Sequence, residues 1–201
     1  APERWQRFAG SEPDDRQYLP WKLIRDADPE LSPQLFQEES FVCVCAETAL
    51  EAESDSDFLE RAVEFVNRDV WGTLCATITV PDAFRQTDHA TLDRCIGKLK
   101  YGAVGINHWP ALNYAFMSTP WGGASGATLQ DVVSGIGNVH NTYFLAGVEK
   151  TVLYGPLTLF PQPVWFPSHP NPEAVGWRLF DLYTKPSLGN LLRTGLTVAL
   201  K

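Results

Sequence analysis

Between residues 41 and 106, apolar runs of strand type alternate with amphipathic stretches of helical type. The runs at 41–46, 71–80 and 103–106 are rich in residues that favour β-strands, and a helical pattern separates each run from the next. A helix between consecutive strands is typical of the crossover connection, which joins parallel strands and is right-handed in nearly every case. The sequence therefore predicts an α/β fold in which helices flank a parallel-type sheet.

The elements of this region have distinct patterns. The run 41–46, FVCVCA, is apolar throughout, which predicts a strand buried on both faces of its sheet. A cap at Ser54 or Ser56 begins the first helix, and the second extends from about residue 88 to 100. Their apolar stripes consist of Phe58, Leu59, Ala62, Phe65 and Val66 in the first helix, and of Leu92, Cys95, Ile96 and Leu99 in the second.

The stretch 101–126, YGAVGINHWPALNYAFMSTPWGGASG, joins the last of these strands to a long loop. Polar residues return at Asn107 and His108, and the loop that follows is rich in aromatic residues, proline and glycine. Aromatic side chains in a loop beyond the carboxyl end of a strand are typical of a pocket wall in an open α/β sheet. We therefore expect a ligand pocket at this end of the sheet.

The chain beyond this loop is expected to form two regions. Apolar residues at 129, 132, 133 and 136 have helical spacing and predict a short helix, and a strand is expected over 151–160. Five prolines between 161 and 172 predict an extended linker, after which Asn171 and Pro172 begin a helix that reaches about Lys185. One more helix is expected over 187–201, so we predict a domain over 1–160 and a proline-rich linker with a helical extension over 161–201.

Charge and cysteine usage restrict the possible partners. Residues 1–100 hold 20 acidic and 11 basic side chains, a net of −9, and residues 101–201 hold 4 and 5, a net of +1, which together give the net charge of −8. An acidic first half repels phosphate groups, so no nucleic-acid partner is expected, and no apolar run has the roughly eighteen residues that a transmembrane segment needs. The cysteines lie in apolar segments without metal-site spacing, which predicts buried, reduced residues of a cytoplasmic protein: Cys43, Cys45, Cys75 and Cys95.

Catalytic signatures are absent from the sequence. It contains no glycine-rich dinucleotide fingerprint and no phosphate-binding loop. Ser125 lies in a Gly-Ala-Ser-Gly turn, but Ala127 stands where a nucleophile elbow has its second glycine. The four histidines are scattered, so we predict neither a catalytic residue nor a metal ligand within this chain.

Four motifs nevertheless occur in a characteristic order. They are EESF at 38–41, AVEFVNRDVWGTLCATITV at 62–80, YGAVGIN at 101–107 and PWGGASG at 120–126. In this order and at this separation they resemble the aldehyde dehydrogenase superfamily, which has E-E-x-F, a helix and a strand, G-x-V-x-(V/I)-N, and P-F-G-G-x-K-x-S-G. The resemblance extends over about residues 18–160. It implies the C-terminal part of an aldehyde dehydrogenase-like catalytic domain, with an oligomerisation-type strand over 151–160.

The resemblance also implies a chemistry and a set of site residues. In the family, a cysteine thiolate attacks an aldehyde, hydride passes to NAD or NADP, and a glutamate-activated water releases the carboxylic acid. The position of Glu39 binds the nicotinamide ribose hydroxyls, which suits an ionised carboxylate, and that of Phe41 forms an apolar wall for the nicotinamide ring. The position of Asn107 helps to hold the active-site loops, and Trp121, in place of the usual phenylalanine, would line the aldehyde pocket.

The chain departs from the family pattern in ways that affect function. Val42 and Cys43 replace the family's Gly-Pro after E-E-x-F, and the glycine loop lacks the family's lysine and is two residues shorter. In the family, the catalytic cysteine, its assisting glutamate and asparagine, and the dinucleotide-binding domain all precede E-E-x-F. We therefore expect a fragment of a cytoplasmic, homo-oligomeric, NAD- or NADP-dependent oxidoreductase that acts on a small aldehyde. The chain alone is expected to be inactive and to bind no cofactor.

Two alternatives remain open at this point. One is a naturally truncated, non-catalytic relative that serves as a binding or assembly module. The other concerns residues 175–200, where apolar residues accompany four basic residues: Arg178, Lys185, Arg193 and Lys201. This pattern is compatible with a membrane surface, although packing against a neighbouring subunit fits it better. A truncated sheet also leaves unpaired edges and exposed apolar faces, which predicts that the fragment self-associates or that it folds only because adaptable loops surround its missing part.

Overall fold

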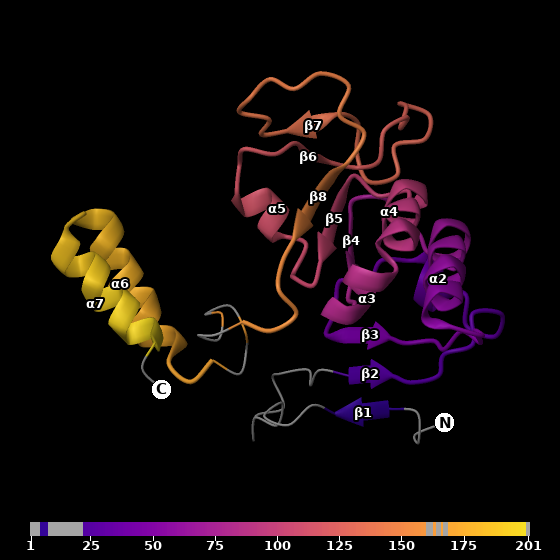
Figure 1. The fold of residues 1–201 in the computed structure, drawn as a ribbon, viewed down its shortest axis with the longest axis horizontal. Coiled ribbons are helices and arrows are strands. Elements are labelled where there is room, and N and C mark those ends of the chain that lie inside the picture. Colours follow the sequence, from indigo (N-terminus) through magenta and orange to yellow (C-terminus); the bar gives the residue numbers. More distant parts are fainter. Residues whose placement is uncertain (1–4, 8–21, 160–162, 164–165, 167–168, 200–201) are drawn as a thin grey trace. The chain divides into compact units, whose positions relative to one another are not determined.

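The computed structural model describes residues 5–7, 22–159, 163, 166 and 169–199 of the chain. The fold is mixed α/β, with small parallel sheets and flanking helices, so the general class predicted from the alternating pattern is confirmed (Figure 1). Contacts between residues divide the chain into two compact units, Ala1–Gly155 and Pro156–Lys201, and each is described by itself. Among the described residues, no helix has the length and apolar character needed to cross a membrane.

A three-stranded parallel sheet forms the centre of the first unit. Its strands, in the order β4-β5-β8, are β4 (Cys75–Ile78), β5 (Ala103–Ile106) and β8 (Thr151–Tyr154). Cys75 pairs with Ala103, which in turn pairs with Thr151, so the three strands begin at the same level. All four residues of the central strand β5 are buried. The predicted strand at 151–160 is confirmed for its first four residues only: residues 155–159 are not in a strand, and residue 160 lies outside the described part of the chain.

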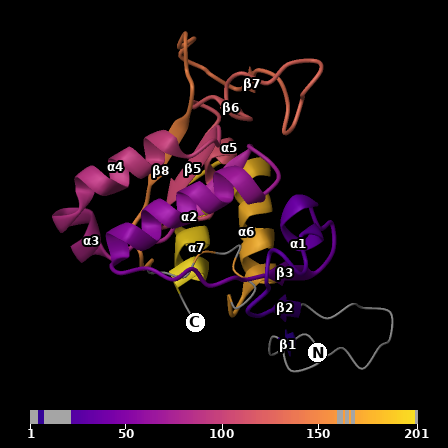
Figure 2. The same cartoon turned by 90° about the vertical axis from the view of Figure 1, so that its right-hand side faces the viewer.

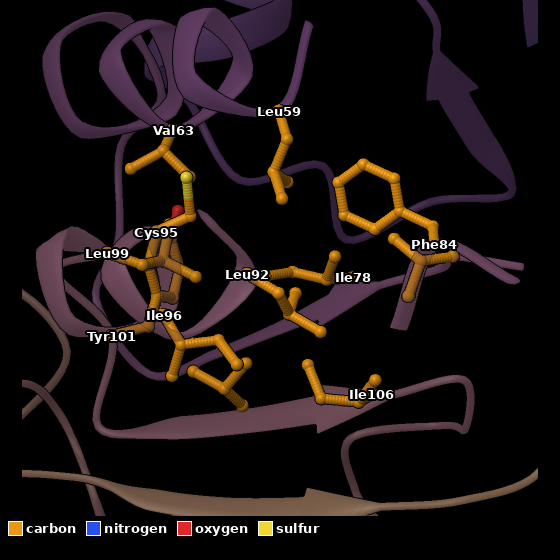
Figure 3. Close-up of a cluster of buried hydrophobic side chains, with 12 residues drawn as sticks. Leu59, Val63, Ile78, Phe84, Leu92, Cys95, Ile96, Leu99, Tyr101 and Ile106 are labelled. Carbon is orange, nitrogen blue, oxygen red and sulfur yellow. The ribbon is translucent and has the colours of Figure 1, made fainter. Parts of the chain in front are cut away.

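Helices cover the sheet on both sides (Figures 1 and 2). One side carries α2 (Asp55–Asp69), α3 (Asp82–Thr87) and α4 (His89–Lys98), and the other carries the short helix α5 (Leu112–Ala115). Ser54 caps α2, as predicted, because its Oγ accepts a hydrogen bond of 3.2 Å from the Asp57 amide. The buried apolar residues of this side form one core between helices and sheet (Figure 3): Leu59, Val63, Ile78, Val80, Phe84, Leu92, Cys95, Ile96, Leu99, Tyr101, Val104 and Ile106.

A second small sheet precedes these helices in the chain. It has the order β1-β2-β3, with β2 antiparallel to β1 and parallel to β3, and its strands are β1 (Trp5–Arg7), β2 (Lys22–Ile24) and β3 (Val44–Ala46). The prediction of a strand at 41–46 buried on both faces is wrong. Phe41 is 87% exposed, and no residue of β3 is buried. Within the described residues, β3 is an edge strand that pairs with β2 alone.

The cysteines are less buried than the sequence predicts. All four thiols are free, but only Cys95 is buried, Cys75 is half-buried, and Cys43 and Cys45 are exposed. The segment 41–46 is exposed or half-buried throughout, which corrects the prediction that its two cysteines are core residues.

The segment 127–150 contains no helix, which corrects the expectation at 129–136. It forms turns and the short strand β7 (Asn138–Val139), which pairs antiparallel with β6 (Trp121–Gly122). The backbone at Val133 and Gly135 has φ values of +45° and +115°, which lie outside the right-handed helical region. Leu129 is 84% exposed, so the apolar stripe finds no surface to pack against, and packing is what stabilises most short helices.

The second unit contains a helical hairpin of α6 (Pro172–Thr184) and α7 (Leu188–Ala199). Both helices confirm the sequence predictions, including the proline at the start of α6. The two helices are joined by side-chain hydrogen bonds, in which Thr194 Oγ1 donates to the Arg178 carbonyl and Asn190 Nδ2 donates to the Asp181 carbonyl. Val175 is the most buried apolar residue between them.

Candidate functional site

Three of the four sequence motifs meet at the backbone of Thr73, just before strand β4. The Thr73 carbonyl accepts hydrogen bonds from the amides of Gly102, at 2.9 Å, and Ala124, at 3.0 Å. The Thr73 amide donates to Ser134 Oγ at 2.8 Å. Because Thr73, Gly102 and Ala124 belong to the motifs at 62–80, 101–107 and 120–126, the structure connects these motifs directly.

The glycine turn of the PWGG motif lies directly on the start of β5. A Cβ atom on Gly102 would lie 2.5 Å from the carbonyl oxygen of Gly123 and would also collide with that of Gly122. A Cβ on Gly122 would in turn lie 2.5 Å from Asn138 Oδ1. These glycines are required because two backbone segments approach more closely than any side chain permits.

Asn107 joins the carboxyl ends of β4 and β5, opposite the end at which the glycine turn lies. Its Oδ1 accepts from the Val80 amide at 2.8 Å, and its Nδ2 donates to the Val80 carbonyl at 2.9 Å. Both residues are buried, and Asn107 has a φ of +61°, a left-handed conformation that asparagine tolerates better than most residues. Asn107 therefore joins the end of β5 to the residues that follow β4.

Glu39 lies near the amino end of β4, where it acts on Cys75. Burial, and then the negative charge of Glu39, raise the pKa of the Cys75 thiol. Burial, and then Cys75, raise the pKa of the nearby Tyr101 hydroxyl. A raised pKa disfavours the thiolate, so this environment does not activate Cys75 as a nucleophile.

A hollow of about 450 Å³ adjoins this cluster. It has polar and charged side chains around its wall, among them Gln37, Arg68 and Lys100, together with Thr73 and Tyr101. Helix α1 (Gln34–Gln37), which leads into the EESF motif, is held here because the Phe36 ring packs edge-to-face on Phe65 of α2, with centroids 5.6 Å apart. Figure 2 shows α1 beside the end of α2.

Trp121 faces a different set of aromatic side chains. Its ring lies edge-to-face against Tyr114, with centroids 5.7 Å apart, and Tyr114 contacts the His140 ring at 4.5 Å. Within the described part of the chain, no hydrogen bond or ring contact joins Trp121 to Glu39 or Phe41. The structure thus brings Glu39 and the glycine turn to the same end of β4, but it does not place the carboxylate against the indole.

The position of the aromatic loop corrects one expectation. The loop begins at the carboxyl end of β5, but the short helix α5 packs on β5 and β8 and reverses the chain, so the PWGG turn returns to the amino end. His108 stays at the carboxyl end and connects two strands instead of facing a pocket. Its Nε2 lies 2.7 Å from the Leu153 carbonyl and its Nδ1 lies 2.8 Å from the Trp109 carbonyl.

Sequence reasoning missed a second hollow, which lies between α2 and the outer edge of β4. Its volume is about 380 Å³, and its wall is mostly apolar, with Phe58 and Ala62 of α2 on one side and Thr77 and Thr79 on the other. Strand β4 is at the edge of the sheet order, so within the described residues no strand pairs with this side of it. Local sequence patterns carry no signal for which edge of a sheet stays open.

Comparisons with family models, with curated proteins and with solved structures found no match to this chain. Within the described ranges, no group of three or more His, Cys, Asp or Glu side chains is arranged to hold a metal ion. The geometry of the chain's own residues is therefore what supports a function.

Proposed function

We propose that this chain is the C-terminal part of the catalytic domain of an NAD- or NADP-dependent aldehyde dehydrogenase-like oxidoreductase, which oxidises a small aldehyde to a carboxylic acid. The observation that carries the proposal is the convergence of the four motifs on one strand. Three share hydrogen bonds at Thr73, and the fourth acts on Cys75 through Glu39. This convergence supports a single site built from the four motifs.

The exposed residues of the EESF motif suit a dinucleotide. In the described part of the chain, no hydrogen bond or ion pair reaches the exposed Glu39 carboxylate, so both of its oxygens are free to accept ribose hydroxyls. Phe41 is 87% exposed and offers an apolar surface to a flat ring. When bound, the dinucleotide would supply the hydride acceptor for the oxidation of the aldehyde.

Trp121 and Asn107 would have different tasks in this reaction. Trp121 is half-buried in an aromatic cluster and would form part of the wall that excludes water from an aldehyde. Asn107 is a positioning residue, because both polar atoms of its side chain bond the Val80 backbone and so keep β4 and β5 in register.

The attacking thiolate of the proposed reaction would come from polypeptide outside this chain. The pKa values of Cys75 and Cys95 are raised, in both cases first by burial, so neither thiol is suited to attack an aldehyde. The open edge of β4 and the apolar hollow beneath α2 support this proposal, since both are surfaces on which further polypeptide would pack.

Enzyme assays on two proteins test the proposal. The 201-residue chain and the product of the complete gene are each assayed for NADH or NADPH formation with a series of aldehydes, and we expect turnover only from the latter. In that product, Glu39→Gln should raise the KM for the dinucleotide about tenfold, since a hydrogen bond to a charged group contributes about 1.5 kcal/mol or more. The neighbouring exposed residue Glu38 provides the control variant Glu38→Gln, which should leave that KM unchanged.

Turnover by the 201-residue chain alone would contradict the proposal, as would a complete gene product whose KM does not respond to Glu39→Gln. The second candidate function is a naturally truncated binding or assembly module without catalysis. The large apolar side chains exposed on α6 and α7 favour this candidate. A reading frame that begins near Ala1 would support it, and one several hundred residues longer would support the enzyme.

A further inference from the structure

Two free thiols, those of Cys43 and Cys45, lie on the same exposed face of one extended segment. From residue 43 to residue 50, exposed and half-buried residues alternate strictly, as they do along a strand with one face toward solvent. Both cysteines belong to the exposed set, and the residue between them is half-buried. Cys43 directly precedes β3, and its carbonyl accepts from the Lys22 amide of β2 at 2.9 Å. The two thiols therefore project side by side.

The spacing of these two thiols suits a bridging ion better than a disulfide. Residues two apart on an extended strand, and their Cβ atoms, lie about 6.6 Å from each other. A disulfide needs Cβ atoms about 3.5–4.5 Å apart, so its formation would bend the segment away from β2. A linear sulfur–metal–sulfur unit spans about 4.6 Å, and rotation of the two side chains about χ1 brings the sulfur atoms to that separation.

The pair supplies two ligands to such an ion. Glu47 is the next residue on this face, but its carboxylate is ion-paired with Arg25, whose Nε lies 3.1 Å from Oε1. Across the part of the chain that the structure describes, no third His, Cys, Asp or Glu side chain completes a metal site around the thiols. Zinc in structural sites is almost always four-coordinate, whereas Cu(I) prefers soft thiolate ligands and is stable with two of them.

The two remaining cysteines do not compete for a soft ion. Cys75 is half-buried and Cys95 is buried, and burial is the first cause that raises the pKa of each thiol. A metal binds the thiolate and not the thiol, so these surroundings disfavour binding at either residue. Thiol exposure and thiol spacing thus select the same pair.

We propose that Cys43 and Cys45 together form a two-coordinate binding site for a single Cu(I) ion. On binding, two S–H bonds break, two Cu–S bonds form and two protons pass to the solvent, while copper keeps its oxidation state. Because both thiols are exposed, the bound ion is open to ligand exchange, which distinguishes this site from a closed structural metal site. The inference does not depend on the proposed enzymatic function.

Anaerobic titration of the reduced 201-residue chain with Cu(I), against a competing chelator, tests this site. Native mass spectrometry should show one copper ion per chain, and X-ray absorption should show two sulfur ligands. Cys43→Ser and Cys45→Ser should each raise the dissociation constant at least about a hundredfold, because two ligands on one strand bind as a chelate. Cys95→Ala removes a buried thiol and is the control, which should bind copper like the wild type. Far-UV circular dichroism shows whether each variant keeps its fold.

A shifted pair tests whether the two thiols must share a face. In the Cys43→Ser background, Glu47→Cys restores the spacing on the exposed face and should recover most of the affinity, whereas Val44→Cys adds a thiol on the half-buried face and should not. Copper binding that survives both serine variants would overturn the inference, as would Glu47→Cys without recovery. One copper ion bound for every two chains, or a third sulfur ligand, would overturn it in favour of ligands shared between copies.

Discussion

Replacing Asn107 with alanine should produce one of the largest losses of stability in the first unit. The change removes both hydrogen bonds to Val80 and leaves its amide and carbonyl buried without partners. Each unsatisfied buried group costs about 1–3 kcal/mol. Alanine at a φ of +61° adds roughly 1 kcal/mol, because its Cβ disfavours the left-handed region. We expect the free energy of unfolding to fall by about 3–7 kcal/mol.

Asn141 provides a control with the same local geometry. It has a φ of +58°, and its side chain accepts from the Leu145 amide at 2.9 Å and donates to the Leu145 carbonyl at 2.8 Å. Leu145 is 55% exposed, so water can replace the lost bonds in Asn141→Ala. That variant should lose only about 1 kcal/mol, mainly from the backbone conformation.

Urea unfolding followed by tryptophan fluorescence measures both variants. The urea midpoint of Asn107→Ala should fall by roughly 1–3 M relative to the wild type, and that of Asn141→Ala by much less. Asn107→Gly loses the same hydrogen bonds but avoids the backbone strain of alanine, so its urea midpoint should lie between those of Asn107→Ala and the wild type. Equal losses for Asn107→Ala and Asn141→Ala would refute the reasoning, since the Val80 backbone would then be accessible to water.

Three further predictions follow from the first unit. Gly102→Ala should lower the urea midpoint because its Cβ would collide with the Gly122 and Gly123 carbonyls, and an unchanged midpoint would mean that the turn is not in contact. Alkylation of Cys75 should be slow at neutral pH and faster in Glu39→Gln, because loss of the negative charge lowers the pKa of the thiol. Equal alkylation rates in the wild type and the variant would mean that the Glu39 charge does not act on the Cys75 thiol. Stability from four carboxylates should be present above pH ~4.5 and lost as the pH falls through their lowered pKa values, so the urea midpoint should drop between pH 5 and 3. The four carboxylates are Asp57, Glu60, Asp69 and Asp88. Hydrogen bonds from arginine side chains lower the pKa values of the first three, and hydrogen bonds from hydroxyl groups lower that of Asp88.

The sequence predicted the helices correctly where the apolar stripe of a segment is buried in the structure. The stripe that includes Leu59 and Val66, the cap at Ser54, and the proline start of α6 are local signals, and the structure contains the corresponding elements. The stripe at 129–136 has the same periodicity but no surface to pack against, so spacing alone was misleading there.

The candidate site was less predictable than the helices. Residue type and order singled out Asn107 and the glycine turn, but the return of that turn to the amino end of β4 depends on α5, a helix of only four residues. The apolar composition of FVCVCA predicted burial, but the segment is exposed or half-buried, because burial depends on what packs over a segment in the assembled fold and not on the segment itself. Long-range pairing of this kind leaves little trace in a local pattern.

The carbonyl of Thr73 accepts from two amides that are far apart in the sequence, those of Gly102 and Ala124. A shared acceptor ties the fluctuations of both segments to one atom, so an opening that frees the glycine turn also loosens the start of β5. The two amide hydrogens should consequently exchange with deuterium in a single cooperative event. The PWGG turn thus moves together with the sheet edge as one kinetic unit, although it belongs to a loop.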